Sequence, residues 1–183
     1  MRRERRWLPA LAVASVIVAV VLGGYVTAGA LSTPASQTRT VAGAVTVVPA
    51  PGWLLVHDLG TPGGTASRFT RGAGTFDVIA GPAGGDAAAV ARTYVVESLE
   101  AGASGPLTVS PDLQAVRLAG GVTGARFSYV GVFDQSGVPI EGEVTTAAAP
   151  SGVGVVFDGW APQGQLRFVL DDVHAMEEGA TFP

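Results

Sequence analysis

Three side chains near the C-terminus have a spacing that suits a metal ion. Asp171, His174 and Glu178 are three and four residues apart, so they share one face if this stretch is helical. Carboxylate and imidazole groups on one face can ligate a divalent cation. Arg167 lies four residues before Asp171, which is also the spacing of an ordinary ion pair. We favour the solvated face of a surface helix and assign no metal ligand.

The two histidines of the chain are candidates for a general base. A serine hydrolase would hold a serine against His57 or His174 and orient the imidazole with a carboxylate. Neither G-x-S-x-G nor S-x-x-K occurs in the sequence, although these motifs mark two common classes of serine enzyme. We therefore predict no active site of the serine type.

Two pairs of glutamates are candidates for the acid and base of glycoside hydrolysis. Glu141 and Glu143 alternate along a predicted strand, and Glu97 and Glu100 lie on a predicted helix. Carboxylates perform this chemistry when they face each other across a cleft. Alternation instead points Glu141 and Glu143 away from the apolar side of their strand, so we predict that they face water.

The remaining candidates are aromatic and glycine-rich. Trp53 and Trp160 can rim a groove for a peptide or lipid, but tryptophans of this kind are more often packed at least partly into the core. The glycine-rich segments fit no phosphate-binding loop, because that motif requires a lysine and the chain has none. We assign no catalytic residue and no cofactor, and predict that the protein is not an enzyme.

The elements that carry these residues follow from hydrophobic periodicity. Glycine-rich residues 59–67 read as a loop, residues 71–74 as a hairpin turn, and Asp86 as the N-cap of the first helix. The predicted strands are residues 41–48, 53–58, 67–70, 75–80, 114–118, 125–133, 138–145 and 153–158. The predicted helices are residues 86–101 and a final helix that begins at Pro162 and ends at Gly179.

The clearest pattern is the run "ARFSYVGVFDQSGVPIEGEVTT", which predicts a hairpin. Pairing its strands places one set of side chains on an apolar face and another on a polar face, where Arg126 and Glu143 pair diagonally. The apolar set is Phe127, Tyr129, Phe133, Ile140 and Val144, and the polar set is Arg126, Ser128, Glu141 and Glu143. Because the predicted strands are mostly consecutive, we predict an α+β fold, with an antiparallel sheet of about six to seven strands packed by two helices.

The start of the chain has the composition of a membrane segment. Residues 1–6 contain four arginines, and residues 7–38 contain no charged side chain. The apolar stretch is about 20 residues long, which is enough for one bilayer crossing, and the basic start orients the N-terminus to the cytoplasm. We predict a cytoplasmic basic region (1–6), a single-pass transmembrane signal-anchor (7–30), a tether (31–40) and an extracytoplasmic domain (41–183).

Cleavage of the same segment is the alternative. Ala28, Gly29 and Ala30 fit the small-x-small pattern of a signal cleavage site, so the protein would be secreted after cleavage near Ala30. Both interpretations place the domain outside the cytoplasmic membrane. We favour the retained anchor, because the apolar run is long for the core of a cleaved signal.

Composition narrows the possible partners. The chain of 183 residues has no cysteine, which excludes disulfides and thiolate metal sites. Beyond residue 6 it carries seven arginines against fourteen acidic residues, a net charge of about −7. Such a domain repels phosphate backbones, so we predict that it does not bind nucleic acid.

The order of elements resembles the PsbP-like fold, which includes the PsbP proteins of photosystem II and LpqN-type envelope lipoproteins of high-GC bacteria. The resemblance covers residues 41–178 and includes the motif Pro51-Gly52-Trp53. The matching stretches are "VPAPGWLL", "RFTRGAGTFDVIAG", "DAAAVARTYVVESLEA", "GARFSYVGVF", "GEVTT", "GVGVVFDGW" and "GQLRFVLDDVHAMEE". The resemblance implies a non-enzymatic accessory or binding domain. The chain departs from the lipoproteins because it has no lipid-accepting cysteine.

These observations together predict a membrane-anchored accessory domain of the cell envelope with a protein or lipid partner. A protein-binding module would show an exposed apolar patch near Trp53 or Trp160. A carrier of a small hydrophobic ligand or lipid would show a closed pocket between the sheet and the helices. An enzyme, the least favoured class, would show a cleft with a titratable pair of perturbed pKa.

Overall fold

The computed structural model describes residues 33–34, 38–61, 64–134 and 136–183. The predicted basic region (1–6) and transmembrane segment (7–30) lie outside these residues. None of the helices in the described ranges has the length and apolarity needed to cross a bilayer. Residues 34–183 form one compact unit, and the described strand β2 begins at Arg39, inside the predicted tether.

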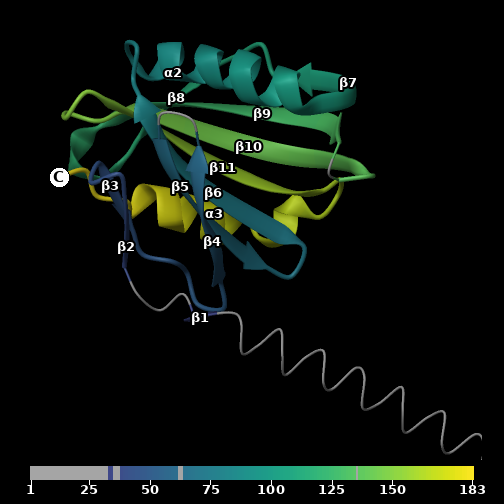
Figure 1. Ribbon diagram of the computed structural model, residues 1–183, viewed down its shortest axis with the longest axis horizontal. Helices are drawn as coiled ribbons and strands as arrows, with labels where there is room; N and C mark the ends of the chain where they lie inside the picture. Colours follow the sequence, from purple (N-terminus) through teal and green to yellow (C-terminus); the bar gives the residue numbers. More distant parts are fainter. Residues whose placement is uncertain (1–32, 35–37, 62–63, 135) are drawn as a thin grey trace, which may run out of the picture. The chain divides into compact units, whose positions relative to one another are not determined.

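The domain is built on an antiparallel sheet whose strand order is β4-β5-β6-β11-β10-β9-β7, with β8 also paired to β9 (Figure 1). Two sequential sets of strands, β4 to β6 and β9 to β11, meet where β6 pairs with β11. A separate two-stranded sheet joins β2 and β3. The strands are β1 (Thr33–Pro34), β2 (Arg39–Val41), β3 (Val45–Val47), β4 (Leu54–Thr61), β5 (Gly64–Arg71), β6 (Gly74–Pro82), β7 (Ala103–Val109), β8 (Gln114–Arg117), β9 (Thr123–Phe133), β10 (Pro139–Ala148) and β11 (Val153–Pro162).

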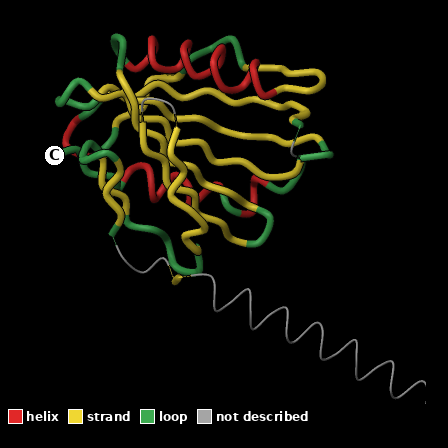
Figure 2. The backbone as a smooth tube through the Cα atoms, in the orientation of Figure 1, coloured by secondary structure: helices red, strands yellow, loops and turns green. Residues whose placement is uncertain are grey.

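Helices cover both faces of this sheet, as the ribbon and the backbone trace show (Figures 1 and 2). On one face lies α2 (Ala87–Tyr94), which continues directly into a π-helix (Val95–Glu100). On the other lies α3 (Leu170–Glu178), which follows a short 3₁₀ turn (Leu166–Phe168). Gly159 of β11 lets α3 approach closely, because a Cβ there would lie 2.8 Å from a methyl group of Val173.

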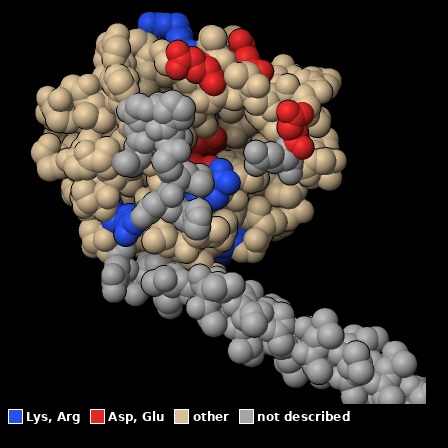
Figure 3. All heavy atoms as spheres, in the orientation of Figure 1, with Lys and Arg blue, Asp and Glu red and all other residues tan. Residues whose placement is uncertain are grey.

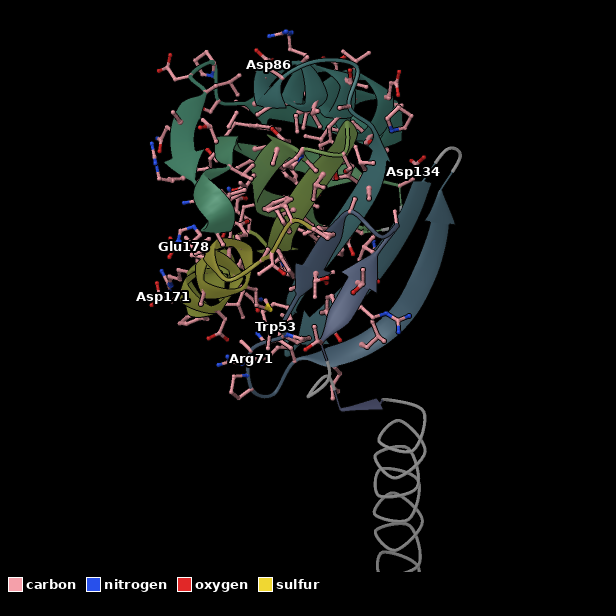
Figure 4. All side chains as sticks on the ribbon, turned by 90° about the vertical axis from the view of Figure 1, so that its left-hand side faces the viewer. Trp53, Arg71, Asp86, Asp134, Asp171 and Glu178 are labelled. Carbon is pink, nitrogen blue, oxygen red and sulfur yellow. The ribbon has the colours of Figure 1, made fainter. Side chains whose placement is uncertain are left out.

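Each face of the sheet has its own hydrophobic core. Under α3, Phe76 and Phe157 stack with ring centroids 6.1 Å apart, and Trp53 meets Phe76 edge-on at 6.3 Å. The indole Nε1 of Trp53 also donates to Asp172 of α3 at 3.0 Å, and Arg71 forms an ion pair with the same carboxylate (Figure 4). The buried core under α2 consists of Ala83, Val90, Ala91, Leu99, Phe127, Tyr129, Ile140, Val144 and Val156.

Most of the predicted elements are confirmed. The side chain of Asp86 caps α2 by accepting a hydrogen bond from the Ala89 N–H at 2.8 Å. The turn between β5 and β6 closes at the predicted place, where Arg71 pairs with Gly74. The hairpin of β9 and β10 has the predicted faces, since Phe127 lies opposite Val144 and Arg126 opposite Thr145.

Four elements differ from the predictions. Residues 41–48 form a turn and parts of β2 and β3, because Ala42 and Gly43 adopt positive φ. Residues 59–67 were predicted as a loop but include strand residues of β4 and β5. The strands were not recognised because glycine contributes no period-two hydrophobic pattern. The predicted strands omitted β7, whose Gly105 and Pro106 suit an edge strand. Pro162 ends β11, and α3 begins at Leu170 instead.

The predicted polar face of β9 and β10 is covered, so the prediction that Glu141 and Glu143 point into water is wrong. Glu143 forms a close contact with His174 of α3. Arg126 Nε lies 3.5 Å from Glu143 Oε1, in agreement with the predicted diagonal pairing. Glu141 accepts a hydrogen bond from the Leu166 N–H at 2.9 Å. The second helix buries this face, which the alternation within a single hairpin cannot reveal.

A charged network lies deeper under α3. Arg126 donates from Nη2 to Glu177 Oε2 at 2.6 Å and from Nε to Thr145 Oγ1 at 2.9 Å. Thr145 Oγ1 in turn donates to Glu177 Oε2 at 2.9 Å. The Glu177 side chain is fully buried, and burial raises its pKa to about 7 despite the nearby Arg126 charge. The network therefore ties β9 and β10 to α3 through one buried carboxylate.

Candidate functional site

Two aspartates lie side by side where the two sets of strands meet. Asp77 of β6 and Asp158 of β11 are direct cross-strand partners, and Arg68 of β5 is the partner of Asp77 on its other side. Direct partners project from the same face of a sheet, with Cβ atoms about 5 Å apart. The pairing therefore sets Arg68, Asp77 and Asp158 in one row on the face that α2 covers.

Asp77 is held by a cation and an indole. Arg68 donates from Nε to Asp77 Oδ1 at 2.6 Å and from Nη2 to Oδ2 at 2.7 Å, so the pair is bidentate. Trp160 Nε1 donates to Asp77 Oδ2 at 3.2 Å. The Arg68 guanidinium also lies 5.6 Å from the centre of the Trp160 ring, which adds a cation–π contact. The pKa of Arg68 is raised, chiefly by its hydrogen bonds to Asp77.

Asp158 is held by two tyrosines instead of a cation. Tyr94 of α2 donates to Asp158 Oδ2 at 2.6 Å, and Tyr129 of β9 lies 3.1 and 3.2 Å from its two oxygens. Gly142 of β10 makes room for the Tyr129 ring, because a Cβ there would overlap it. Burial raises the pKa of Asp158 to about 7, with the Asp77 charge adding to the rise and the tyrosine hydrogen bonds opposing it.

These side chains form the floor of an open pocket of about 470 Å³ between the sheet and the helical segment of residues 87–100. The volume is within the range of small-molecule sites. Figure 3 shows a hollow on this face with acidic atoms in its depth and basic atoms beside them. The lining residues are Arg68, Asp77, Tyr94, Ser98, Leu99, Gly102, Tyr129, Phe133, Asp134, Ser136, Ile140, Asp158 and Trp160.

The pocket combines a negatively charged floor with an aromatic and aliphatic wall. All four oxygens of Asp77 and Asp158 already accept hydrogen bonds from the domain itself. Both tyrosine pKa values are raised by burial and by the Asp158 charge, so these hydroxyls stay protonated as donors. Such an arrangement fixes the floor in one geometry and can orient a ligand above it.

The side chains first considered as metal ligands are not brought together. Asp171 and Glu178 are exposed on the side of α3 that faces away from the sheet (Figure 4). His174 is half-buried and contacts Glu143 instead. Within the described ranges, no three side chains of the His, Cys, Asp and Glu types are grouped to hold a metal ion.

The other candidates belong to separate elements of the domain. His57 belongs to β4, where its backbone pairs with Arg68. Glu97 and Glu100 are exposed on the π-helix. Of the two tryptophans, Trp53 is in the core with 1 % of its surface exposed, and Trp160 is half-buried and lines the pocket.

Asp77 and Asp158 were not among the predicted site residues, although each carries a local signal. Both follow a phenylalanine inside an apolar strand, in "TFDVIA" and "VVFDGW". A carboxylate at such a position needs a buried partner, because an unpaired buried charge is costly. Their adjacency could not be predicted, since β6 and β11 are far apart in sequence and pair through tertiary structure.

Asp158 is expected to make the domain less stable as the pH rises towards neutrality. Between pH values of about 4 and 7 the native carboxyl keeps a proton that the unfolded chain has lost, so stability falls as pH rises through this window. Glu177 acts in the same direction, and each group contributes a slope of up to about 1.4 kcal/mol per pH unit. Asp158→Asn should flatten the dependence by about half in urea unfolding measured from pH 4 to 8.

Asp112→Asn is the matched control for this measurement. Asp112 is exposed and does not line the pocket, so its variant should reproduce the slope of the unsubstituted protein. An unchanged slope in Asp158→Asn would show that this carboxyl is ionised in the native state throughout the range.

The fold is similar to that of solved structures. No family model matches the chain, and no curated protein matches its sequence. The solution structure of cyanobacterial PsbP (CyanoP) from Synechocystis sp. PCC 6803 matches with a TM-score of 0.57 at 14 % identity, covering 82 % of this chain and 95 % of that one.

A looser match is the crystal structure of LpqN, described as involved in cell envelope biogenesis of Mycobacterium tuberculosis. Its TM-score is 0.43 at 14 % identity, over 83 % of this chain and 91 % of that chain. The CyanoP match agrees with the order of strands and helices that the sequence patterns predicted. The domain therefore has the PsbP-like fold.

Proposed function

We propose that the protein is a non-catalytic accessory domain, held on the outer side of the cytoplasmic membrane by residues 7–30, that binds a small ligand in the pocket beside α2. The pocket floored by Asp77 and Asp158 is the observation that carries this proposal. Its size and its few convergent polar groups are typical of a ligand site. The uncharged stretch after a basic start supports the membrane location.

The structure favours ligand binding over docking of a protein near the tryptophans. An exposed apolar patch was expected there for a protein-binding module. Trp53 itself is buried in the core, and the exposed apolar side chains next to it in sequence are Leu54 and Val56. Trp160 lies at the pocket, where its Nε1 is occupied by Asp77. The pocket lies between sheet and helix, where a carrier was expected to have one, but it is open and not closed as predicted.

The feature expected of an enzyme, a cleft with a titratable pair of perturbed pKa, is also present, because Asp77 and Asp158 lie together in the pocket and the pKa of Asp158 is raised to about 7. We favour a role without turnover because both carboxyl groups are held by the domain itself. Every carboxylate oxygen on the pocket floor accepts a hydrogen bond from Arg68, Trp160 or a tyrosine. These hydrogen bonds hold the two carboxyl groups in one geometry, which suits recognition of a ligand. The PsbP-like fold by itself specifies neither ligand nor activity, so the proposal depends on the site.

Native mass spectrometry of the full chain, released from gently solubilised membranes, tests the proposal. The unsubstituted protein should carry a bound small molecule and should still contain peptides from residues 1–30. Ser98→Trp should lose the molecule, because Ser98 is exposed on the π-helix and lines the pocket, so an indole there fills the space.

Ser151→Trp is the matched control, since Ser151 is exposed and lies outside the pocket. This variant should retain the ligand. Retention of the ligand by Ser98→Trp, or an empty unsubstituted protein, would contradict ligand binding in this pocket. A mature chain that begins near Leu31 would instead identify a secreted carrier and contradict the anchor.

A further inference from the structure

We propose that the pocket selects an organic cation, a ligand with an ammonium or guanidinium group on an apolar body, which its charged floor and aromatic wall recognise together. The inference rests on the proposed ligand-binding function and names the chemical class of the ligand. Three observations support it: the pocket, the row of charged side chains on its floor, and the contact of Arg68 with the Trp160 ring.

The charges around the pocket favour a cation. Asp77, Asp134 and Asp158 line it, and Arg68 is the one basic side chain among its lining residues. Arg68 binds Asp77 through two of its five N–H donors, so its charge is balanced by that carboxylate. Asp158 has only neutral donors, from Tyr94 and Tyr129, so its negative charge has no cationic partner in direct contact.

Arg68 shows the chemistry that the pocket offers. Its guanidinium lies over the Trp160 ring while it forks onto the Asp77 carboxylate. An aromatic face beside a carboxylate is how proteins recognise ammonium and guanidinium ligands. The second carboxylate, Asp158, stands directly beside this arrangement without a cation of its own.

An organic cation fits better than a metal ion or an anion. In the part of the chain that the structure describes, no group of three metal-ligating side chains occurs. The pocket also exceeds the size of a single ion, and Leu99, Ile140 and Phe133 give it an apolar wall. An anion would be repelled by the three aspartates of the pocket, since the single Arg68 charge is already balanced by Asp77.

Binding of an ammonium group should displace the proton of the Asp158 carboxyl. The groups that face this carboxyl are Tyr94 from α2, Tyr129 from β9, Asp77 from β6 and, beyond Asp77, Arg68 from β5. When an ammonium group binds, the proton on Asp158 leaves to solvent, so the charge of the site is conserved. The raised pKa of Asp158 means that this proton is present in the empty pocket below neutral pH.

The test compares three probes of similar shape on the full chain in detergent micelles: phenethylamine, phenethyl alcohol and phenylacetate. Each is titrated while the indole N–H signals of Trp160 and Trp53 are followed by NMR. Trp160 reports on the pocket, whereas Trp53 donates to Asp172 on the opposite face and is an internal control. Phenethylamine should shift the Trp160 signal and bind at least tenfold more tightly than the other two.

The pH dependence gives a second readout. Competition with the Asp158 proton should make phenethylamine bind about tenfold more weakly at pH 6 than at pH 8. Calorimetry at pH 6 in buffers of different ionisation enthalpy should detect close to one proton released. Asp158→Asn should weaken amine binding at pH 8 at least tenfold and abolish both effects, whereas Asp112→Asn should change neither.

The outcomes separate this inference from the proposed function. If phenethyl alcohol or phenylacetate moves the Trp160 signal as tightly as phenethylamine, the cation class is wrong but the pocket still binds ligands. If no probe moves it while the protein from membranes carries a ligand that Ser98→Trp loses, the cation class is also wrong. If no probe binds and the protein from membranes is empty, the proposed function fails as well.

Discussion

Arg126→Met is expected to lower the free energy of unfolding by about 2–3 kcal/mol at pH 8, because it leaves the buried Glu177 carboxyl without its cation. Without the guanidinium the pKa of Glu177 rises further, so at pH 8 the buried carboxyl must take up a proton or remain charged beside Thr145. At pH 5, below the Glu177 pKa of about 7, the carboxyl is neutral. The loss should then fall to about 1–2 kcal/mol, from lost hydrogen bonds alone. Urea unfolding at the two pH values measures the difference.

Two further variants isolate the buried charge as the cause. Arg126→Met combined with Glu177→Met replaces both ions with apolar side chains of similar length and should recover most of the loss at pH 8. Arg117→Met removes an exposed arginine and should change stability by no more than about 0.5 kcal/mol. Equal losses at pH 5 and pH 8 would show that packing, and not the Glu177 charge, sets the cost.

Gly142→Ala should destabilise the domain by about 2–4 kcal/mol, because a methyl group cannot fit beside Tyr129. The new Cβ would lie 2.6 Å from the Tyr129 hydroxyl oxygen and closer still to its ring. Tyr129 would have to leave Asp158, so a buried carboxyl would also lose a hydrogen-bond donor. Thermal and urea unfolding measure the loss.

A double-mutant cycle with Tyr129→Leu assigns the effect to this contact. Removing the ring should relieve the overlap, so the two substitutions together should cost about 1–3 kcal/mol less than their sum. Gly102→Ala is the control, since its new Cβ would lie 3.6 Å from Phe133, an ordinary contact. Strict additivity in the cycle would mean that Gly142 is required for some other reason.

Local patterns predicted much of the fold. The β9–β10 hairpin followed from the alternation around Phe127 and Val144, and the start of α2 followed from Asp86. These features depend on neighbours in sequence, which periodicity and capping residues report directly. The edge strand β7 escaped prediction because Gly105 and Pro106 break the pattern while an edge position tolerates both.

The site was not predictable in the same way. Arg68, Asp77 and Asp158 come from three strands, and only the pairing of β6 with β11 makes the two carboxylates neighbours. Likewise, the partner of Glu143 is on a helix thirty-one residues further along the chain. A single sequence shows that a charged residue interrupts an apolar strand, but it does not show which other strand supplies the partner.

The pairing of β6 with β11 also bears on the order of folding. The sets β4 to β6 and β9 to β11 each join strands that follow one another in sequence, so they close short loops. Trp160 and its acceptor Asp77 are 83 residues apart, and bringing them together closes a long loop at a larger entropic cost. The pairing of β6 with β11 should therefore form last. The pocket cannot exist until β11 has been synthesised. If the chain is exported unfolded, ligand capture can begin only after nearly the whole domain has crossed the membrane.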